Sequence, residues 1–501
     1  MIGHSSAMPS VAPDSSFTEQ GDSLHASLSA TSSPLESHAS EPVYAERISR
    51  FAHALRPEDI PEPVRECAKD LMLDSIGIAL ASSSQDFAAA SLGAFHSLNE
   101  QPGSSTVIGS SGRLPLRDAV HVNGILIHGL DFDDTHPEAL VHTSCAVLPV
   151  VFALGESGSF SGAEALVSHI LGVEVATRVG LAAERGFHRH GHHSTAICGA
   201  FGASVSASRL LGLTHAQMTM AQGIVGSMAA GSLEFLEDGA WVKRSHAGWA
   251  GVSAITAAAL AKNGFTGPRS VYEGRYGILS SHARSDPDAR RSSLSRVPMF
   301  GEPWEIMNVG IKPYPACLFT HAFADAALAL RREEEFRLED IQSIVCPSSE
   351  LGVQMVFEPL AEKKKPVNSY AAQFSVPYIV ATAIVRGTFG LRELEPDLLG
   401  DEAILMLAEK VSYTADPATG FPRTLSGEVI IELANGKVIR RREQVNRGCG
   451  DRPLSRNEII EKFFRNTDGV VSRGRANEIV EHLLDIERSS DLGELMSLLR
   501  R

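Results

Sequence analysis

The chain has 501 residues, of which 43% are hydrophobic and 21% charged, a balance typical of a globular protein long enough for two domains. Its formal net charge of −15 argues against nucleic acid as a partner, because binding phosphates requires a basic surface. The six cysteines are far apart and form no CxxC pair, so neither a zinc site, an iron–sulfur cluster nor a disulfide framework is indicated. Apolar stretches are short and rich in alanine and glycine, so we expect no bilayer-spanning segment and no membrane partner.

Residues 1–42 are rich in serine, alanine, proline, histidine and glutamate and lack hydrophobic periodicity, which predicts a disordered tail. This segment has no apolar core of a secretory signal. It contains acidic residues but neither lysine nor arginine, unlike a mitochondrial transit peptide. We therefore expect a cytoplasmic protein, with a mitochondrial location as the alternative.

Residues 43–290 show the periodicity of helices. In the first clear example, Val64, Leu71 and Ile78 share one face, and Pro61 stands where a helix would begin. Further helices are expected at residues 163–179, 195–211, 215–230 and 247–262, and a short strand at residues 107–109. The many small residues in these segments predict close helix–helix contacts in an all-helical domain.

A second domain of mixed structure is predicted at residues 300–450, after a polar connector at residues 281–296. We expect strands at residues 341–347, 427–433 and 438–443, with a hairpin at Gly436 between the last two. We expect helices at residues 321–331, 377–386 and 401–410. Residues 455–501 are helical again, which predicts a mainly α fold. In this fold a smaller α+β domain is inserted into a large helical domain formed by residues 43–290 and 455–501.

Residues 128–142 are the most polar cluster in the chain. It comprises Asp131, Asp133, Asp134, Glu138, Thr135, His128, His136 and His142. Ionised groups lose solvation when buried, so such a cluster between hydrophobic helices predicts a polar network or a reaction site. A solvated loop at a helix end is the alternative interpretation.

Residues 186–195 hold four histidines, at positions 188, 190, 192 and 193, together with Arg189. Imidazole is a common metal ligand, but the spaced ligands of a motif such as HExxH are missing. We favour an anion site at a helix N-terminus, where Ser194 and Thr195 would cap the helix.

Residues 237–249 bring Lys243, Arg244 and His246 together ahead of an alanine-rich helix. A solvated charged loop is the alternative here. The flanking Trp241 and Trp249 indicate burial, and a buried lysine is costly unless an anion meets it.

Residues 310–321 contain Lys312, Tyr314, Cys317 and His321 among prolines. Cys317 could act as a nucleophile with His321 as its base, although a single cysteine is more often a small packing residue. The chain has no Walker loop, GxSxG elbow or GxGxxG fingerprint in the required context. These residue types therefore suit an enzyme that transfers protons to or from a small polyanion without a cofactor or a metal.

Four motifs together resemble the MmgE/PrpD family. They are Asp131-Phe-Asp-Asp-Thr135 with His142, the histidine-rich run at 186–193, Trp241-Val-Lys-Arg-x-His246 and Lys312-Pro-Tyr-Pro-x-Cys317. The resemblance extends over residues 45–500. It implies a large all-helical domain, a smaller α+β lid domain, a homodimer and no metal. The family includes 2-methylcitrate dehydratases, cis-aconitate decarboxylases and an iminodisuccinate epimerase.

Resemblance to the decarboxylase branch places Asp131, Thr135, His142, His193 and Lys243 on active-site positions. Cys317 stands where the animal decarboxylase has a further histidine. The motif around Lys243 is similar to fungal decarboxylases, whereas Lys-Pro-Tyr-Pro is similar to bacterial dehydratase-like members. The two cues therefore point to different reactions.

These observations lead us to expect a lyase that acts on a citrate- or aconitate-like tricarboxylate. The expected catalytic residues are His142 and His193 as acid and base, Lys243 for developing negative charge, and Asp131 to orient or charge a histidine. The expected substrate-binding residues are Thr135, His246, Arg244, Tyr314 and Cys317, the last two from the lid.

Our first expectation is dehydration of a 2-methylcitrate-type alkylcitrate. The alternatives are decarboxylation of cis-aconitate to itaconate, epimerisation of a dicarboxylate, and a non-catalytic protein that binds a carboxylate. The intact set of acidic, basic and imidazole side chains argues against the last, because a protein that had lost catalysis would be free to lose them.

Overall fold

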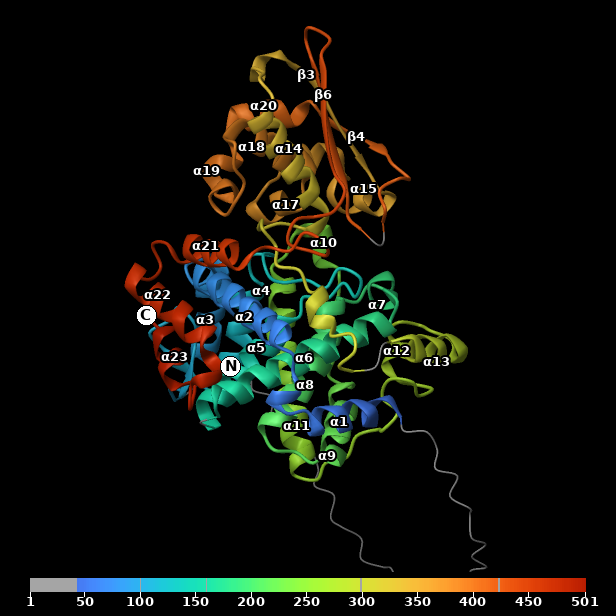
Figure 1. The fold of residues 1–501 in the computed structure, drawn as a ribbon, viewed down its shortest axis with the longest axis vertical. Coiled ribbons are helices and arrows are strands. Elements are labelled where there is room, and N and C mark those ends of the chain that lie inside the picture. Colours follow the sequence, from blue (N-terminus) through green and yellow to red (C-terminus); the bar gives the residue numbers. More distant parts are fainter. Residues whose placement is uncertain (1–42, 100, 159, 298–299, 422–423) are drawn as a thin grey trace, which may run out of the picture. The chain divides into compact units, whose positions relative to one another are not determined.

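The computed structural model describes residues 43–99, 101–158, 160–297, 300–421 and 424–501. The tail predicted at residues 1–42 lies outside these ranges. Residues 42–501 form one compact unit with two clusters of buried apolar side chains. The first cluster draws on residues 44–311 and 459–499, and the second on Phe235 and residues 314–439. The predicted fold class is confirmed: helices dominate, and strands are confined to small sheets (Figure 1).

The helical part is built around long helices that contact one another closely. Its main helices are α2 (Glu62–Ser82), α4 (Leu116–His128), α5 (Ser144–Gly158), α6 (Gly162–Ala182), α8 (Ser194–Leu210) and α11 (Val242–Lys262). Helix α8 packs against α6 and α11, and α11 packs against α4. A Cβ atom at Gly124 would lie 2.5 Å from the Cα of Gly248, and one at Gly202 would lie 2.3 Å from the Gly172 carbonyl oxygen. Small residues therefore allow the backbones to approach, as the composition predicts.

Helix α6 is long and apolar enough to cross a bilayer by composition alone. However, 94% of its most apolar window is buried inside the protein, and it lies against α8 and α5. Its hydrophobicity is therefore explained by its place in the core.

Shorter helices complete this part of the chain. They are α1 (Tyr44–Ala54), α3 (Asp86–Leu98), α7 (Gly186–Arg189), α9 (His215–Val225), α10 (Phe235–Asp238), α12 (Ile278–Ser281) and α13 (Pro287–Arg296). Two predictions were wrong. The strand predicted at 107–109 is instead a pairing of β1 (Ser105–Thr106) with β2 (Arg113–Leu114). The predicted connector contains α13, because Asp286 caps that helix by accepting hydrogen bonds from two backbone N–H groups.

The α+β part, residues 314–451, contains a sheet with the strand order β4-β3-β5-β6. Its strands are β3 (Ile341–Ser348), β4 (Val411–Ala415), β5 (Gly427–Leu433) and β6 (Val438–Glu443). Strand β3 is parallel to β4 and antiparallel to β5. Strand β4 was not predicted, because its side chains are mostly half-buried or exposed and show little alternation.

The α+β part also contains helices. They are α14 (His321–Glu333), α15 (Glu350–Val356), α16 (Leu360–Lys364), α17 (Ser369–Gln373), α18 (Val376–Arg386), α19 (Pro396–Leu399) and α20 (Glu402–Glu409). Helix α14 packs on β5 and β6, and α18 packs on α14 and α20. The helices predicted at residues 321–331, 377–386 and 401–410 correspond to α14, α18 and α20.

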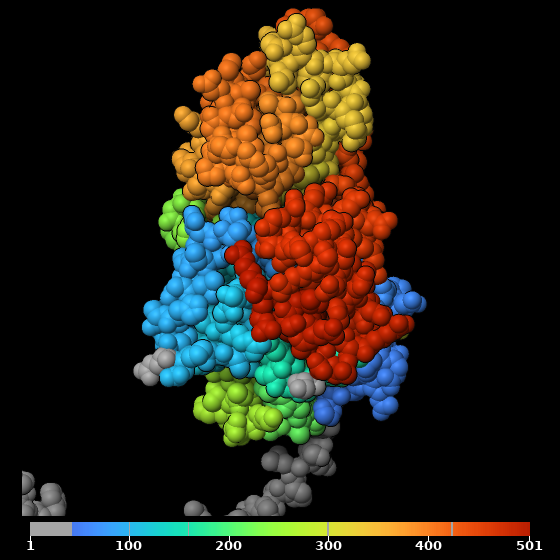
Figure 2. All heavy atoms as spheres, turned by 90° about the vertical axis from the view of Figure 1, so that its left-hand side faces the viewer, coloured from blue at the N-terminus to red at the C-terminus, as the bar shows by residue number. Residues whose placement is uncertain are grey.

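The C-terminal segment, red in Figure 2, returns to the helical part and lies beside blue segments from the start of the chain. It forms α21 (Arg456–Thr467), α22 (Arg473–Leu484) and α23 (Gly493–Leu498), and α21 packs against α2. Lys462 of α21 pairs with Asp74 of α2 at 2.6 Å. Its ammonium group also lies 3.6 Å from the ring centre of Phe132 and donates to the Phe132 carbonyl oxygen. The returning helix therefore supports the polar loop that follows α4.

The close contact between α4 and α11 predicts that replacing a glycine there by alanine lowers the stability of the protein, which is the opposite of the usual effect. Replacing a helical glycine by alanine normally stabilises a protein by about 0.5–1 kcal/mol. In Gly124→Ala the added Cβ would meet the Gly248 backbone at 2.5 Å, which cannot yield as a flexible side chain can. We expect a loss of about 1–3 kcal/mol in the free energy of unfolding, measured by urea denaturation.

The matched control is Gly93→Ala in α3, where the new Cβ has no described neighbour within 4 Å. This variant should be as stable as the wild type or slightly more stable. Equal stabilisation by both substitutions would show that the α4–α11 contact can accommodate an added methyl group.

Candidate active site

The polar clusters found in the sequence meet at a cavity of about 340 Å³. The polar and charged side chains that line its floor are Asp131, Thr135, His142, His193, Lys243 and Lys312. They come from the loop after α4, the start of α8, the start of α11 and the segment that leads into the α+β part. Segments far apart in sequence therefore supply one site.

The loop after α4 is held in a specific conformation. The backbone of Asp131 has φ 49°, in the left-handed region, which costs a residue other than glycine about 1–3 kcal/mol. The backbones of Thr135 and Gly310 exchange two hydrogen bonds of 2.9 Å, and the Gln373 amide donates to the Leu130 carbonyl oxygen at 2.5 Å. Contacts from residues 310 and 373 thus stabilise this strained turn.

The carboxylate of Asp131 lies between two ammonium groups. Its Oδ1 is 2.7 Å from Lys243 Nζ and 3.1 Å from Lys312 Nζ, and Lys312 also donates to the Asp131 carbonyl oxygen at 2.9 Å. Burial by itself would raise the pKa of Asp131, but the two lysine charges outweigh burial and hold that pKa well below its usual range. Two ammonium groups thus converge at the lining of the cavity, which favours an anionic ligand there.

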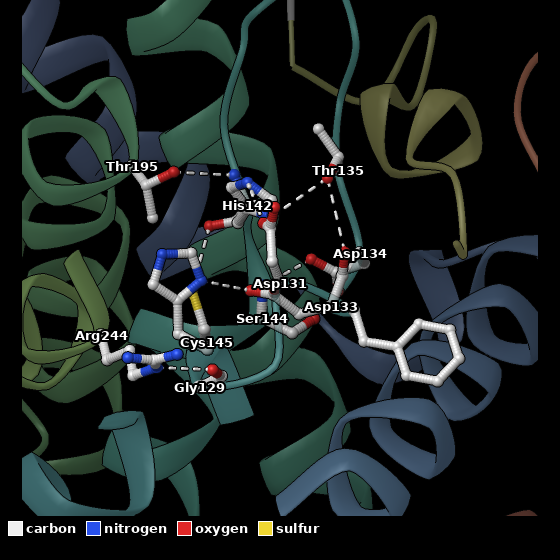
Figure 3. A network of polar contacts seen from close by, with 12 residues as sticks. Gly129, Asp131, Asp133, Asp134, Thr135, His142, Ser144, Cys145, Thr195 and Arg244 are labelled. Carbon is white, nitrogen blue, oxygen red and sulfur yellow. Dashed lines mark hydrogen bonds and ion pairs between the residues drawn. The ribbon is translucent and has the colours of Figure 1, made fainter. Parts of the chain in front are cut away.

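Asp133 connects two histidines in the network shown in Figure 3. Its Oδ2 lies 2.8 Å from His128 Nδ1, and its Oδ1 lies 3.2 Å from His142 Nδ1. The Thr135 hydroxyl oxygen is 3.0 Å from the same nitrogen of His142. A carboxylate can only accept, so the contact with Asp133 favours a proton on His142 Nδ1. The other ring nitrogen of His142, Nε2, then faces Asp131 Oδ1 at 3.9 Å.

The Asp133 and His128 pair is fully buried. Burial lowers the pKa of His128 to about 4, although Asp133 opposes this shift. Burial would raise the pKa of Asp133, but its interactions with His128 and His142 outweigh burial and hold it below its usual range. We therefore take Asp133 as ionised and His128 as a neutral donor.

His193 forms a second pair with His246, their Nδ1 atoms being 3.1 Å apart, so that one ring donates and the other accepts. Burial, with the nearby positive charges second, lowers the pKa of His193 well below its usual range and that of His246 to about 4. Both rings are therefore neutral near pH 7. His193 lines the cavity, and His246 lies behind it.

Three predicted substrate-binding residues are not among the described residues that line the cavity: Arg244, His246 and Tyr314. The Arg244 guanidinium donates to the Gly129 carbonyl oxygen at 2.7 Å and lies against the rings of Phe87, Trp241 and Tyr370. The Tyr314 hydroxyl donates to Asp325 at 2.7 Å. These contacts hold Arg244 and Tyr314 in the walls of the site, outside the described lining of the cavity.

Cys317 does line the cavity, as predicted. Burial, followed by the Asp131 charge, raises the pKa of its thiol, so the thiol stays protonated. His321 donates to the Ala316 carbonyl oxygen at 3.0 Å, and burial lowers its pKa to about 3. This geometry gives no support to a nucleophile and base formed by Cys317 and His321.

The residues predicted to form an anion site at the start of α8 have a different role. His193, not Ser194, precedes the first helical residue, and the Thr195 hydroxyl accepts a hydrogen bond from the His142 backbone N–H at 3.0 Å. Thr195 therefore fixes the position of His142. Of the four histidines in this run, His188 and His193 line the cavity.

Two groups of described side chains have metal-ligand spacing: His128, Asp133 and Cys145, and Asp131, Asp133 and His142. Burial and neighbouring carboxylates keep the Cys145 thiol protonated by raising its pKa well above the usual value. In the second group, Asp131 is already paired with two ammonium groups that would repel a cation. Neither donor set favours a metal ion.

Two residues of the site, Asp133 and Lys312, had no predicted role. Both lie within the sequence motifs at residues 131–135 and 312–317. The signal for Lys312 was a lysine that follows Ile311 in an apolar stretch and precedes two prolines, since a buried lysine requires an anion. The sequence could not distinguish Asp133 from its neighbours, because three of the residues 131–134 are aspartates and only the loop conformation decides which groups each side chain contacts.

Two family models and several known proteins match this chain. The model of the MmgE/PrpD N-terminal domain matches residues 46–290, and that of the MmgE/PrpD C-terminal domain matches residues 314–486. The chain is 29% identical to the cis-aconitate decarboxylase of Aspergillus terreus, over 94% of this chain and 98% of the relative. It is 29% identical to the cis-aconitate decarboxylase of Homo sapiens, over 91% and 94%. It is also 27% identical to the cis-aconitate decarboxylase-like protein oryM of Aspergillus oryzae, over 89% and 95%.

The buried neutral histidines predict a loss of stability in mild acid. Burial lowers the pKa of His128 to about 4 and that of His169 to about 3, whereas histidines in the unfolded chain titrate near 6.5. Between these values the unfolded state binds more protons, so the free energy of unfolding falls as the pH falls. Each such histidine should contribute a slope of about 1.4 kcal/mol per pH unit.

The measurement is urea denaturation between pH 7 and pH 5. His169→Gln should reduce the slope, whereas His53→Gln, at an exposed position of α1, should leave it unchanged. An identical slope in the wild type and in both variants would contradict the assignment of His169 as buried and neutral.

Proposed function

The chain belongs to the MmgE/PrpD family and is a lyase, and we propose that it decarboxylates cis-aconitate or a closely similar unsaturated tricarboxylate. The single observation that carries this proposal is the convergence of Lys243 and Lys312 beside His142 and His193 in one cavity. The similarity to cis-aconitate decarboxylases over nearly the whole chain supports the choice of reaction.

The ammonium groups supply the binding energy for carboxylates. Lys243 and Lys312 both contact Asp131, which holds them in place before a substrate arrives. A substrate carboxylate next to them would replace part of this pairing beside two buried lysines, where electrostatic interactions are stronger than in bulk water. The arrangement therefore fixes a polyanion and stabilises negative charge that shifts onto a remaining carboxylate.

The reaction requires one proton donor. The bond from carbon to the departing carboxylate breaks, and its electron pair forms a new double bond to the central carbon. The electron pair of the original double bond then takes a proton at the adjacent carbon, and CO₂ leaves. His142 suits the role of donor, because its ring lines the cavity and its two nitrogens face the carboxylates of Asp131 and Asp133.

Dehydration of an alkylcitrate is the second candidate. One observation favours it: the cavity holds two imidazoles in different environments, His142 beside carboxylates and His193 kept neutral by burial. A dehydration needs such an acid and such a base, one to protonate the leaving hydroxyl and one to remove a proton next to a carboxylate.

A proton NMR time course distinguishes the two reactions. The purified protein is incubated separately with cis-aconitate, citrate and 2-methylcitrate. We expect vinylidene signals and release of CO₂ from cis-aconitate alone. A new alkene without CO₂ release in a citrate tube would identify a dehydratase instead, and no change in all three tubes would contradict both proposals.

Lys243→Met tests the role of the ammonium groups in the same assay. We expect kcat/KM to fall by at least about 10²-fold, because a charge that stabilises the transition state is lost. The control is Lys262→Met at the exposed end of the same helix, which should keep full activity. Equal activity of the two variants would show that Lys243 has no part in turnover.

Asp133→Asn tests whether Asp133 positions His142. The amide keeps the shape of the side chain but can donate to His142 Nδ1, which would place the ring proton on the wrong nitrogen. We expect kcat to fall by about 10²–10⁴-fold with KM changed much less. A shifted pH profile of kcat should accompany the loss, whereas a purely structural role of Asp133 would lower the melting temperature and leave the profile of the remaining activity unchanged.

A further inference from the structure

The cavity is lined by a third permanent cation besides Lys243 and Lys312, the guanidinium of Arg185. The two lysine ammonium groups meet at Asp131 Oδ1. The Arg185 guanidinium instead lies 5.0 Å from the ring centre of Phe421, another residue of the lining. The cavity therefore presents positive charge at a second place, apart from the lysine pair.

The charges that act on Arg185 differ from those at the lysine pair. Burial lowers the pKa of Arg185, Glu138 raises it, and Arg189 lowers it further. The pKa of Asp131, by contrast, is lowered by Lys243 and Lys312. An arginine keeps its charge near pH 7, and its planar guanidinium fits a carboxylate through two parallel hydrogen bonds. Arg185 is therefore suited to bind a carboxylate of its own.

The backbone at Arg185 is held in an unfavourable conformation. Arg185 has φ 63° and the preceding Glu184 has φ 47°, so two consecutive residues other than glycine lie in the left-handed region. Five described residues other than glycine have a positive φ, and three of them line the cavity: Asp131, Leu140 and Arg185. Such strain persists only where the surrounding structure enforces it, and it is concentrated at binding sites.

His188 lies near Arg185 and also lines the cavity. Burial, followed by the charges of Lys243 and Arg185, lowers the pKa of His188, so its ring is neutral near pH 7 and keeps one N–H donor. Within the described ranges, this ring has no hydrogen-bond partner in the protein. Because Lys243 and Arg185 both act on it, His188 lies within reach of both cationic places.

We propose that Arg185 and His188 form a second carboxylate subsite, which binds the carboxylate of the substrate that Lys243 and Lys312 do not hold. This inference rests on the proposed function, because it takes the lysine pair as the site of the other carboxylates. It adds that Arg185 makes the cavity select a tricarboxylate over a dicarboxylate of the same carbon skeleton.

Binding of two unreactive analogues tests the subsite without requiring turnover. Methylsuccinate is tricarballylate without one terminal carboxylate. Isothermal titration calorimetry at pH 7 gives the ratio of the two dissociation constants. In the wild type we expect tricarballylate to bind about ten-fold more tightly or better, because one more carboxylate accepts charge-assisted hydrogen bonds. A wild-type ratio near one would overturn the inference.

Three variants assign the effect to Arg185. Arg185→Gln should reduce the ratio by about ten-fold or more and change the Kd of methylsuccinate much less. Arg185→Lys keeps the charge but not the planar fork, so it should give an intermediate ratio. The control is Arg189→Gln, which removes the same charge from an exposed side chain outside the described lining and should leave the ratio unchanged.

A purely structural role of Arg185 would weaken the binding of both analogues equally and keep the ratio, which would overturn the inference. An equal fall of the ratio in Arg185→Gln and Arg189→Gln would also overturn it, because the effect would then come from the general charge of this region.

The two proposals fail in different ways. Turnover of cis-aconitate by the wild type, with an unchanged binding ratio in Arg185→Gln, would refute the subsite and leave the proposed reaction intact. A ratio that depends on Arg185, together with no turnover of cis-aconitate or of the citrates, would support the subsite and refute the proposed reaction.

Discussion

The rest of the site depends on one buried carboxylate, that of Asp131, held between Lys243 and Lys312. Neither ammonium group could be buried without an anion, and the carboxylate could not be buried without a cation. Their pairing therefore joins the loop after α4, the first turn of α11 and the segment that leads into the α+β part. Because both ammonium groups line the cavity, this structural contact also creates the attraction for an anionic substrate.

Close packing of helices makes this contact precise. Helices α4 and α11 touch at Gly124 and Gly248, where any larger side chain would force the backbones apart. Helix α4 ends at His128, immediately before the polar loop, and α11 begins at Val242, immediately before Lys243. The small residues of the core therefore set the distance between the loop and the lysine. Stability and the geometry of the site follow from the same packing.

The helical part and the α+β part contribute different kinds of side chain to the cavity. The helical part supplies most of the charged and titratable side chains, and the α+β part supplies apolar surface and the contact from Gln373 that holds the loop.

The sequence by itself determined the fold class, the main helices, the hairpin at Gly436 and the segments that form the site, because periodicity and turn chemistry are local properties. Tertiary structure alone decided which side chains within those segments face the cavity. Lys243 and Arg244 are neighbours on α11, yet successive helical residues point in directions about 100° apart, so one meets Asp131 and the other meets Gly129. The pairing of Asp133 with two histidines likewise depends on a loop conformation fixed by contacts with distant residues.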